Sequence, residues 1–267
     1  ERASAELEVL TAVTKAVSTA VSAKEKGEHY IPEPQFDTCG YNYPEYKTIE
    51  MPALAEVDMN KSLDEAEYEK KLKKYQDKLF KLQNLCYQKK IPVIICYEGW
   101  DAAGKGGNIK RIAAALDPRG YEVHPIAAPE PSELARHYLW RFWTRLEKNG
   151  HFTIFDRTWY GRVMVEPIEK LTPEERVNMA YREINEFESH LHAWGAEIIK
   201  FWVNVDKDEQ LRRFNERENT PEKRWKITDE DWRNREKWDT YEKYVDRMIT
   251  LTSTDIAPWT ILEGNDK

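Results

Sequence analysis

The feature that most constrains the fold is a glycine-rich loop between a short apolar run and a helical one. Residues 91–97 read IPVIICY, which suits a buried strand, and they lead directly into EGWDAAGKGG at residues 98–107. Gly99, Gly104 and Lys105 therefore have the spacing and the strand–loop–helix context of a P-loop, whose backbone N–H groups and lysine hold phosphate oxygens. A tight turn without a ligand is the alternative, and it leaves Lys105 unexplained.

The loop offers several groups to a phosphate chain. The helix that follows it adds the positive end of its dipole, and Lys105 is expected to reach the phosphoryl group that is transferred. We predict phosphate contacts from Gly99, Ala102, Ala103, Gly104, Lys105, Gly106 and Gly107.

One position departs from the usual P-loop pattern. Ser or Thr normally follows the lysine and helps to hold Mg²⁺, whereas this chain has Gly106, which has no side-chain ligand atom. Asp101 lies inside the loop, where it would repel bound phosphates unless a cation lay between them. We therefore predict that Asp101 lies on the metal side; a surface-capping role is the alternative.

A second carboxylate follows another apolar run. Residues 151–155 read HFTIF, and Asp156 and Arg157 come directly after them. Ligands of a doubly wound sheet gather beyond the carboxyl ends of its strands, so Asp156 should face the loop that contains Asp101. We predict that Asp156 is a Walker-B-like metal ligand, and that Arg157 balances transferred charge rather than serving only as a structural partner of Asp156.

Short apolar runs alternate with longer helical ones after residue 90, which is typical of a parallel sheet with helices on both faces. The expected strands are 92–97, 121–127, 152–155, 198–205 and 260–262, and the expected helices are 105–116, 131–148, 173–194 and 230–250.

Two more helices are expected before the first strand. Apolar residues recur at helical spacing between positions 7 and 21, and an irregular arm rich in Pro and Tyr follows to about residue 60. Residues 63–89 then form an amphipathic helix that should pack on the core. Its apolar stripe consists of Tyr68, Leu72, Tyr75, Leu79, Leu82 and Cys86.

A basic segment follows the strand expected at 198–205. Positions 210–226 hold six basic residues in seventeen: Arg212, Arg213, Arg217, Lys223, Arg224 and Lys226. P-loop kinases often close a basic helical lid over the phosphates to exclude water, so we predict such a lid at about residues 207–228. Interleaved glutamates favour the alternative, a solvated helix face.

Composition limits the classes of function. With 267 residues and 40% hydrophobic content, the chain can bury one α/β core with a helical appendage. The formal charge of −7 gives no overall positive field for nucleic acid or a membrane surface. No apolar run approaches the ~20 residues that cross a bilayer. The three cysteines lack CxxC spacing, which favours a reduced, cytoplasmic setting. A first residue other than Met suggests a processed chain or a fragment.

Over residues 63–267 the sequence resembles the type-2 polyphosphate kinase family. The motifs that carry this resemblance are residues 98–107, FDRTWY at 155–160, QLRRF at 210–214 with ER at 216–217, KRWK at 223–226 and WRNREKW at 232–238. AP at 128–129, HYLWRFW at 137–143, TST at 252–254 and APWT at 257–260 are most similar to the catalytic C-terminal half of polyphosphate:AMP phosphotransferases, which carry two fused kinase-like halves.

The resemblance implies a three-layer α/β P-loop kinase fold at 63–267, with a parallel sheet and a helical lid, preceded at 1–62 by extra N-terminal helical and irregular structure. It implies Mg²⁺ as cofactor, inorganic polyphosphate as donor, and AMP, with ADP as a further candidate, as acceptor. A fragment of a tandem protein would explain both ends of the chain. Oligomeric state, including a homo-oligomer, is left open.

Carried over by position, the resemblance implies that Asp101 and Asp156 position the metal. It implies that Lys105 and Arg157 contact the phosphoryl group that is transferred. It also gives Arg217, Lys223 and Arg224 to the lid. We expect phosphate contacts from these three residues and from Arg212 and Arg213, and we expect Arg217 to be catalytic as well. The candidates for nucleotide contacts are Arg157, Tyr160, Arg162 and Glu166.

Two other functions use the same motifs. One is an ATP-dependent nucleotide kinase, and the other is a non-catalytic half that binds polyphosphate. Joint retention of Asp101, Lys105 and Asp156 argues against the second, because binding a polyanion needs the basic residues but not two carboxylates.

Overall fold

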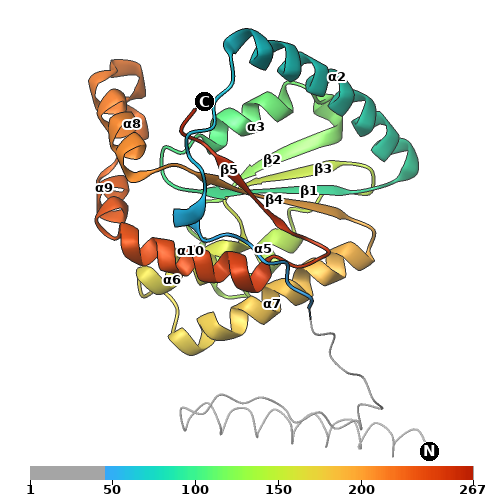
Figure 1. Ribbon diagram of the computed structural model, residues 1–267. Coiled ribbons are helices and arrows are strands. Elements are labelled where there is room, and N and C mark those ends of the chain that lie inside the picture. Colours follow the sequence, from blue (N-terminus) through green and yellow to red (C-terminus); the bar gives the residue numbers. More distant parts are fainter. Residues whose placement is uncertain (1–45, 267) are drawn as a thin grey trace, which may run out of the picture. The chain divides into compact units, whose positions relative to one another are not determined.

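A five-stranded parallel sheet forms the centre of residues 46–266, the part of the chain that this computed structural model describes (Figure 1). The strands are β1 (Val93–Gly99), β2 (Tyr121–Pro125), β3 (Phe152–Asp156), β4 (Glu197–Asn204) and β5 (Trp259–Glu263), in the order β2-β3-β1-β4-β5. The central strand β1 is buried along almost its whole length. Its continuous apolar run is what a parallel strand covered on both faces requires.

Helices cover both faces of this sheet. In Figure 1, α2 and α3 lie on one side, and α5, α6, α7 and α10 lie on the other. The helical elements are η1 (Leu54–Glu56), α2 (Glu65–Lys89), α3 (Lys105–Ala113), η2 (Pro118–Gly120), α4 (Pro131–Leu134), α5 (Trp140–Trp143), η3 (Trp159–Val163), α6 (Val165–Ile168), α7 (Glu174–Ala193), α8 (Lys207–Asn219), η4 (Pro221–Lys226), α9 (Asp229–Glu236) and α10 (Trp238–Thr252). The predicted three-layer α/β architecture is confirmed.

The five predicted strands are all present, and each end lies within two residues of the expected one. The helix expected at 131–148 is wrong as a single element, because the chain forms two separate turns, α4 and α5. Glu133 of α4 accepts a hydrogen bond from Arg145, which follows α5, at 2.7 Å. Phe142 of α5 packs in the hydrophobic core. The helix expected at 230–250 is divided at Lys237 into α9 and α10.

The predicted apolar stripe of α2 is only partly correct. Tyr75 and Leu82 are 59% and 43% exposed. Gln83 is buried instead, and its carboxamide accepts from the backbone N–H of Asp117 at 2.7 Å. The helix therefore packs partly on loop backbone, which an amide can satisfy and an apolar side chain cannot.

The helix and arm expected before residue 46 lie outside the described residues, and the domain boundary near residue 62 stays a prediction. Among the helices of residues 46–266, none combines the length and the apolar character that crossing a membrane demands.

Candidate active site

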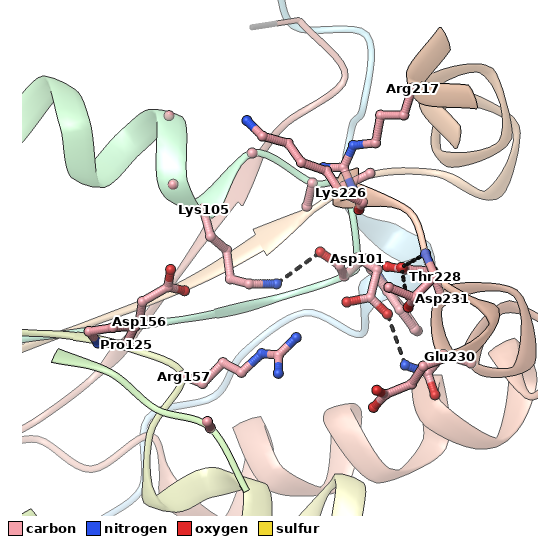
Figure 2. A pocket seen from close by; sticks show the side chains of 18 of the residues that line it. Asp101, Lys105, Pro125, Asp156, Arg157, Arg217, Lys226, Thr228, Glu230 and Asp231 are labelled. Carbon is pink, nitrogen blue, oxygen red and sulfur yellow. Dashed lines mark hydrogen bonds between the residues drawn. The ribbon is translucent and has the colours of Figure 1, made fainter. Parts of the chain in front are cut away.

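A cavity of about 780 Å³ opens at the carboxyl ends of the central strands. It brings together Asp101, Lys105, Asp156, Arg157 and Arg217, the five residues predicted to be catalytic. The loop residues Ala102, Ala103, Gly104, Gly106 and Gly107 also line it. Figure 2 shows Asp101, Lys105, Asp156 and Arg157 around one space. Sequence reasoning missed several lining residues: Trp100, Pro125, Ile126, Ala127, Trp225, Thr228, Glu230, Asp231 and Asn234.

The loop folds this way because its backbone passes close to β4. A Cβ on Gly99 would lie 2.4 Å from the carbonyl oxygen of Val203, so only glycine fits there. Gly104, at the start of α3, has a φ of 115°, in the range that favours glycine. Ala102 adopts a φ of 59° without being glycine. Such conformations are costly and persist only where surrounding contacts impose them.

Lys105 begins α3 and points along the loop. Its Nζ donates to the carbonyl oxygens of Gly99 at 2.6 Å and Trp100 at 3.0 Å. Burial lowers the pKa of Lys105, and the nearby carboxylates of Asp101 and Glu98 oppose that shift. The two backbone bonds hold the ammonium group at the wall of the cavity, where a phosphate oxygen can replace them.

The two predicted metal carboxylates line the same cavity from different elements. Asp156 ends β3 opposite Tyr97 of β1. Within residues 46–266 its side chain makes no ion pair or hydrogen bond, so its oxygens are available to a ligand. Asp101 accepts a 3.0 Å hydrogen bond from Asn234 of α9.

These donors fit Mg²⁺, which takes hard oxygen ligands and is commonly bound by one or two carboxylates together with substrate phosphates. Gly106 offers no side-chain ligand, as expected.

Arg157 and the turn after β3 are fixed by the end of β1. The backbone N–H of Arg157 donates to the carbonyl oxygen of Tyr97 at 3.0 Å, and its guanidinium group points toward the cavity (Figure 2). Glu98 is 3% exposed, and it accepts from the N–H and the hydroxyl of Thr158 at 2.7 and 2.8 Å. Burial raises the pKa of Glu98, whereas the bonds from Thr158 lower it. The sequence signal for Glu98 was its place at the start of the loop motif.

The basic segment, residues 207–228, contributes less to the cavity than predicted. Arg217 and Lys226 line it, and Arg217 donates to the backbone carbonyl of Lys226 at 3.0 Å. Three other residues predicted to bind phosphate do not line it. Arg212 pairs with Glu209 and Glu216, Lys223 pairs with Glu216, and Arg224 donates to the carbonyl of Glu218. In this arrangement their cationic groups are bonded within the segment itself.

Arg213 was predicted to bind phosphate, and the structure gives this prediction no support, because Arg213 does not line the cavity. Its side chain is 2% exposed, and it donates to the carbonyl oxygens of Ala102 at 3.1 Å and Ala103 at 2.9 Å. It also bonds the carbonyls of Gly264 and Asn265 and pairs with Glu209 at 2.6 Å. Arg213 therefore ties α8 to the P-loop backbone. Its bond to the carbonyl oxygen of Ala102 helps to impose the left-handed backbone conformation of that residue.

The candidates for nucleotide contacts other than Arg157 lie elsewhere. Tyr160 is fully buried, and its hydroxyl donates to Glu188 at 2.6 Å, so the structure gives its predicted contact with a nucleotide no support. Arg162 and Glu166 form a 2.9 Å ion pair. Arg162 lines a different cavity, of about 370 Å³.

A strand–P-loop–helix unit, an Asp–Arg pair on the neighbouring strand and a basic helical segment around one cavity define a P-loop kinase fold. Comparison with protein families narrows this class. The family described as polyphosphate kinase 2 (PPK2) matches residues 62–267, and the chain belongs to that family.

Several curated relatives match most of this chain. A polyphosphate:AMP phosphotransferase from Acinetobacter johnsonii is 53% identical over 204 residues, which is 76% of this chain and 42% of that protein. One from Pseudomonas aeruginosa is 49% identical, over 80% of this chain and 43% of the relative. The chain thus spans less than half the length of these relatives. An ADP-polyphosphate phosphotransferase from Rhizobium meliloti is 36% identical over 78% of this chain and 69% of the relative.

Solved structures agree with the fold. A polyphosphate kinase 2 from Pseudomonas aeruginosa has a TM-score of 0.78 at 49% identity, over 80% of this chain and 46% of that one. A second, from Arthrobacter aurescens, has a TM-score of 0.78 at 28% identity, over 82% of this chain and 81% of the other.

Proposed function

We propose that this chain transfers the terminal phosphoryl group of inorganic polyphosphate to AMP, with Mg²⁺. The observation that carries the proposal is the single cavity around which the P-loop, Lys105, Asp101, Asp156 and Arg157 are placed. Its volume of about 780 Å³ lies in the range of small-molecule sites. The names of the relatives at 49–53% identity support the choice of substrates.

Each side chain has a proposed task in positioning and charge balance, which dominate phosphoryl transfer. Lys105 and the loop N–H groups hold the donor phosphates. Asp101 and Asp156 hold Mg²⁺, which when bound neutralises phosphate charge. Arg157 stabilises the transferred phosphoryl group from the turn after β3. Arg217 stabilises the same group from the basic segment, which we propose acts as a lid.

AMP is preferred to ADP as the proposed acceptor because of the relatives. Those named for AMP are 49–53% identical to this chain, whereas those named for ADP or NDP are 35–38% identical. The attacking phosphate of the acceptor must lie in line with the terminal phosphoryl group of the donor. In ADP one more phosphate separates the nucleoside from that attacking phosphate, so ADP needs a deeper pocket than AMP.

The test is a set of initial-rate measurements in which AMP or ADP is offered with polyphosphate or ATP at fixed Mg²⁺. We expect the highest kcat/KM for polyphosphate with AMP, and a loss of ~10³-fold or more in kcat in the Lys105→Met variant. If ADP exceeded AMP by about tenfold, or ~1.4 kcal/mol in transition-state binding, the acceptor assignment would be wrong. Transfer from ATP but not from polyphosphate would instead favour an ATP-dependent nucleotide kinase.

Several expectations stay predictions. They are a cytoplasmic location, the absence of nucleic-acid and membrane partners, and the division of the chain into residues 1–62 and a kinase domain at 63–267.

A further inference from the structure

A second cavity, of about 610 Å³, lies at the other end of the sheet. Its walls come from the carboxyl end of α2, residues 117–120 before β2, and residues 148–151 before β3. The parallel strands start side by side, with Val93 and Tyr121 both paired to Phe152, so these walls meet at the amino edge of the sheet. The P-loop follows the carboxyl edge, roughly 20 Å away along the strands. The cavity is therefore separate from the candidate active site.

Close packing shapes the walls of this amino-edge cavity. Gln83 is 4% exposed, and its carboxamide bonds both the N–H and the carbonyl of Asp117, at 2.7 and 3.1 Å. A Cβ on Gly120 would lie 2.5 Å from the Gln83 amide nitrogen, and one on Gly150 would lie 3.0 Å from the Cα of Tyr87. Both glycines let the loops approach α2 closely, so the cavity is preorganised rather than a gap between loops.

The cavity carries a local positive charge in a chain whose formal charge is −7. Lys90, Arg119 and Lys148 line it, against the single carboxylate of Asp117, which leaves a net +2. Arg119 bonds both carboxylate oxygens of Asp117, at 3.0 and 2.7 Å, and lowers the pKa of that group to about 2. Lys90 and Lys148 form no ion pair within residues 46–266, so both are available to an anion.

An exposed aromatic ring and carboxamides complete the lining. Tyr87 is 54% exposed, and its ring meets that of His151 edge-on with centroids 5.8 Å apart. The Nζ of Lys90 lies 4.6 Å from the centroid of the same ring. Asn84 and Asn149 add hydrogen-bonding groups that suit the edge of a heterocycle.

We propose that the amino-edge cavity binds a nucleoside phosphate. Lys90, Lys148 and Arg119 hold its phosphate, Tyr87 packs against its base, and the two asparagines bond its edge. Cations supply charge-assisted hydrogen bonds to phosphate oxygens, and an exposed tyrosine ring gives a base a surface on which to stack. The volume suffices for one such ligand.

The test is hydrogen exchange of the full chain, followed peptide by peptide, with AMP as the probe. We expect AMP to slow exchange at residues 117–120 and 148–151 in the wild-type protein. The double variant K90E/K148E changes two exposed side chains and should keep the fold. It should require at least about tenfold more AMP for the same protection. The matched control K74E/K78E makes the same charge change on the outer face of α2 and should behave as the wild type.

Two further probes separate the parts of the ligand. Adenosine should protect these segments less than AMP, because it lacks the phosphate that the lysines bind. The proposal is overturned if AMP gives no protection at 117–120 and 148–151, if K90E/K148E leaves that protection unchanged, or if tripolyphosphate protects these segments and AMP does not. Since exchange is read locally, each outcome is independent of whether the P-loop cavity performs the proposed transfer.

Discussion

The two sides of the candidate active site hold their cations in different ways. On the P-loop side, Lys105 is half-buried and bonded to two backbone carbonyls, and the loop beneath it is tied to α8 by Arg213. Across the cavity, Arg217 and Lys226 belong to the basic segment, in which Arg212 and Lys223 pair with Glu216 at the surface. One side is preorganised, and the other is held by bonds that a polyanion can replace. Substitutions on the P-loop side should therefore cost more.

The largest effect is expected at Lys105. Lys105→Met removes a fixed charge that we propose holds the donor phosphates, and it should lower kcat by ~10³-fold or more. Its thermal transition should stay close to that of the wild type, since no buried ion pair is broken. Steady-state kinetics and a melting curve measure both effects. Lys110→Met, on the exposed face of the same helix, is the control. A loss at Lys105 below tenfold would contradict a preorganised lysine.

The second-largest loss of turnover is expected at the carboxylates Asp101 and Asp156. Asp101→Asn and Asp156→Asn should each lower turnover by roughly 10²- to 10³-fold, because each removes a carboxylate that we propose binds Mg²⁺. Titration with Mg²⁺ should show that both variants need a higher concentration for half-maximal rate. Asp77→Asn, on the outer face of α2, should leave the titration unchanged. An unchanged Mg²⁺ requirement in both Asp101→Asn and Asp156→Asn would contradict the proposal that these carboxylates bind Mg²⁺.

Two adjacent arginines of α8 provide a comparison in stability. Arg213→Met leaves Glu209 and the carbonyls of Ala102 and Ala103 without their buried partner, so unfolding should become easier by ~3 kcal/mol. Arg212→Met breaks only exposed pairs and should cost less than about 0.5 kcal/mol. Urea denaturation measures both values. Equal losses would mean that Arg213 does not tie α8 to the P-loop.

The smallest effect is expected in the basic segment. Arg217→Ala should lower kcat/KM for polyphosphate by about tenfold, and less at high salt, where charges at the surface are screened. Lys223→Ala should have little effect, because Lys223 pairs with Glu216 and does not line the cavity. Rates measured over a range of salt concentrations test this pair. A larger loss in Lys223→Ala than in Arg217→Ala would contradict the placement of these side chains.

The difference between the P-loop side and the basic segment also explains which site residues could be predicted from the sequence. In the P-loop, the positions of Asp101 and Lys105 follow from one continuous strand–loop–helix unit, and Asp156 follows from the parallel pairing of β3 with β1. Backbone geometry alone places these residues, so the motif spacing was sufficient.

The basic segment was harder because neighbouring residues on a helix point about 100° apart. Nothing local in the sequence distinguishes Arg213, which is buried, from Arg212, which is exposed. The difference depends on carbonyls more than a hundred residues away in the chain. The burial of Tyr160 could not be predicted for the same reason, since its partners Glu188 and Lys200 lie on α7 and β4. Asn234 lies within a quoted motif, WRNREKW, which is the only signal that could have suggested it.

The most direct test of the central claim is a single-turnover measurement by rapid quench, with enzyme in excess over polyphosphate and with AMP and Mg²⁺ fixed. The wild-type protein, Lys105→Met and Arg217→Ala are compared in one experiment. A preorganised P-loop side and an adaptable basic segment predict that Lys105→Met is slower than Arg217→Ala by ~10²-fold, or ~2.7 kcal/mol in barrier height. Equal rate constants in the two variants, or a slower Arg217→Ala, would contradict the claim.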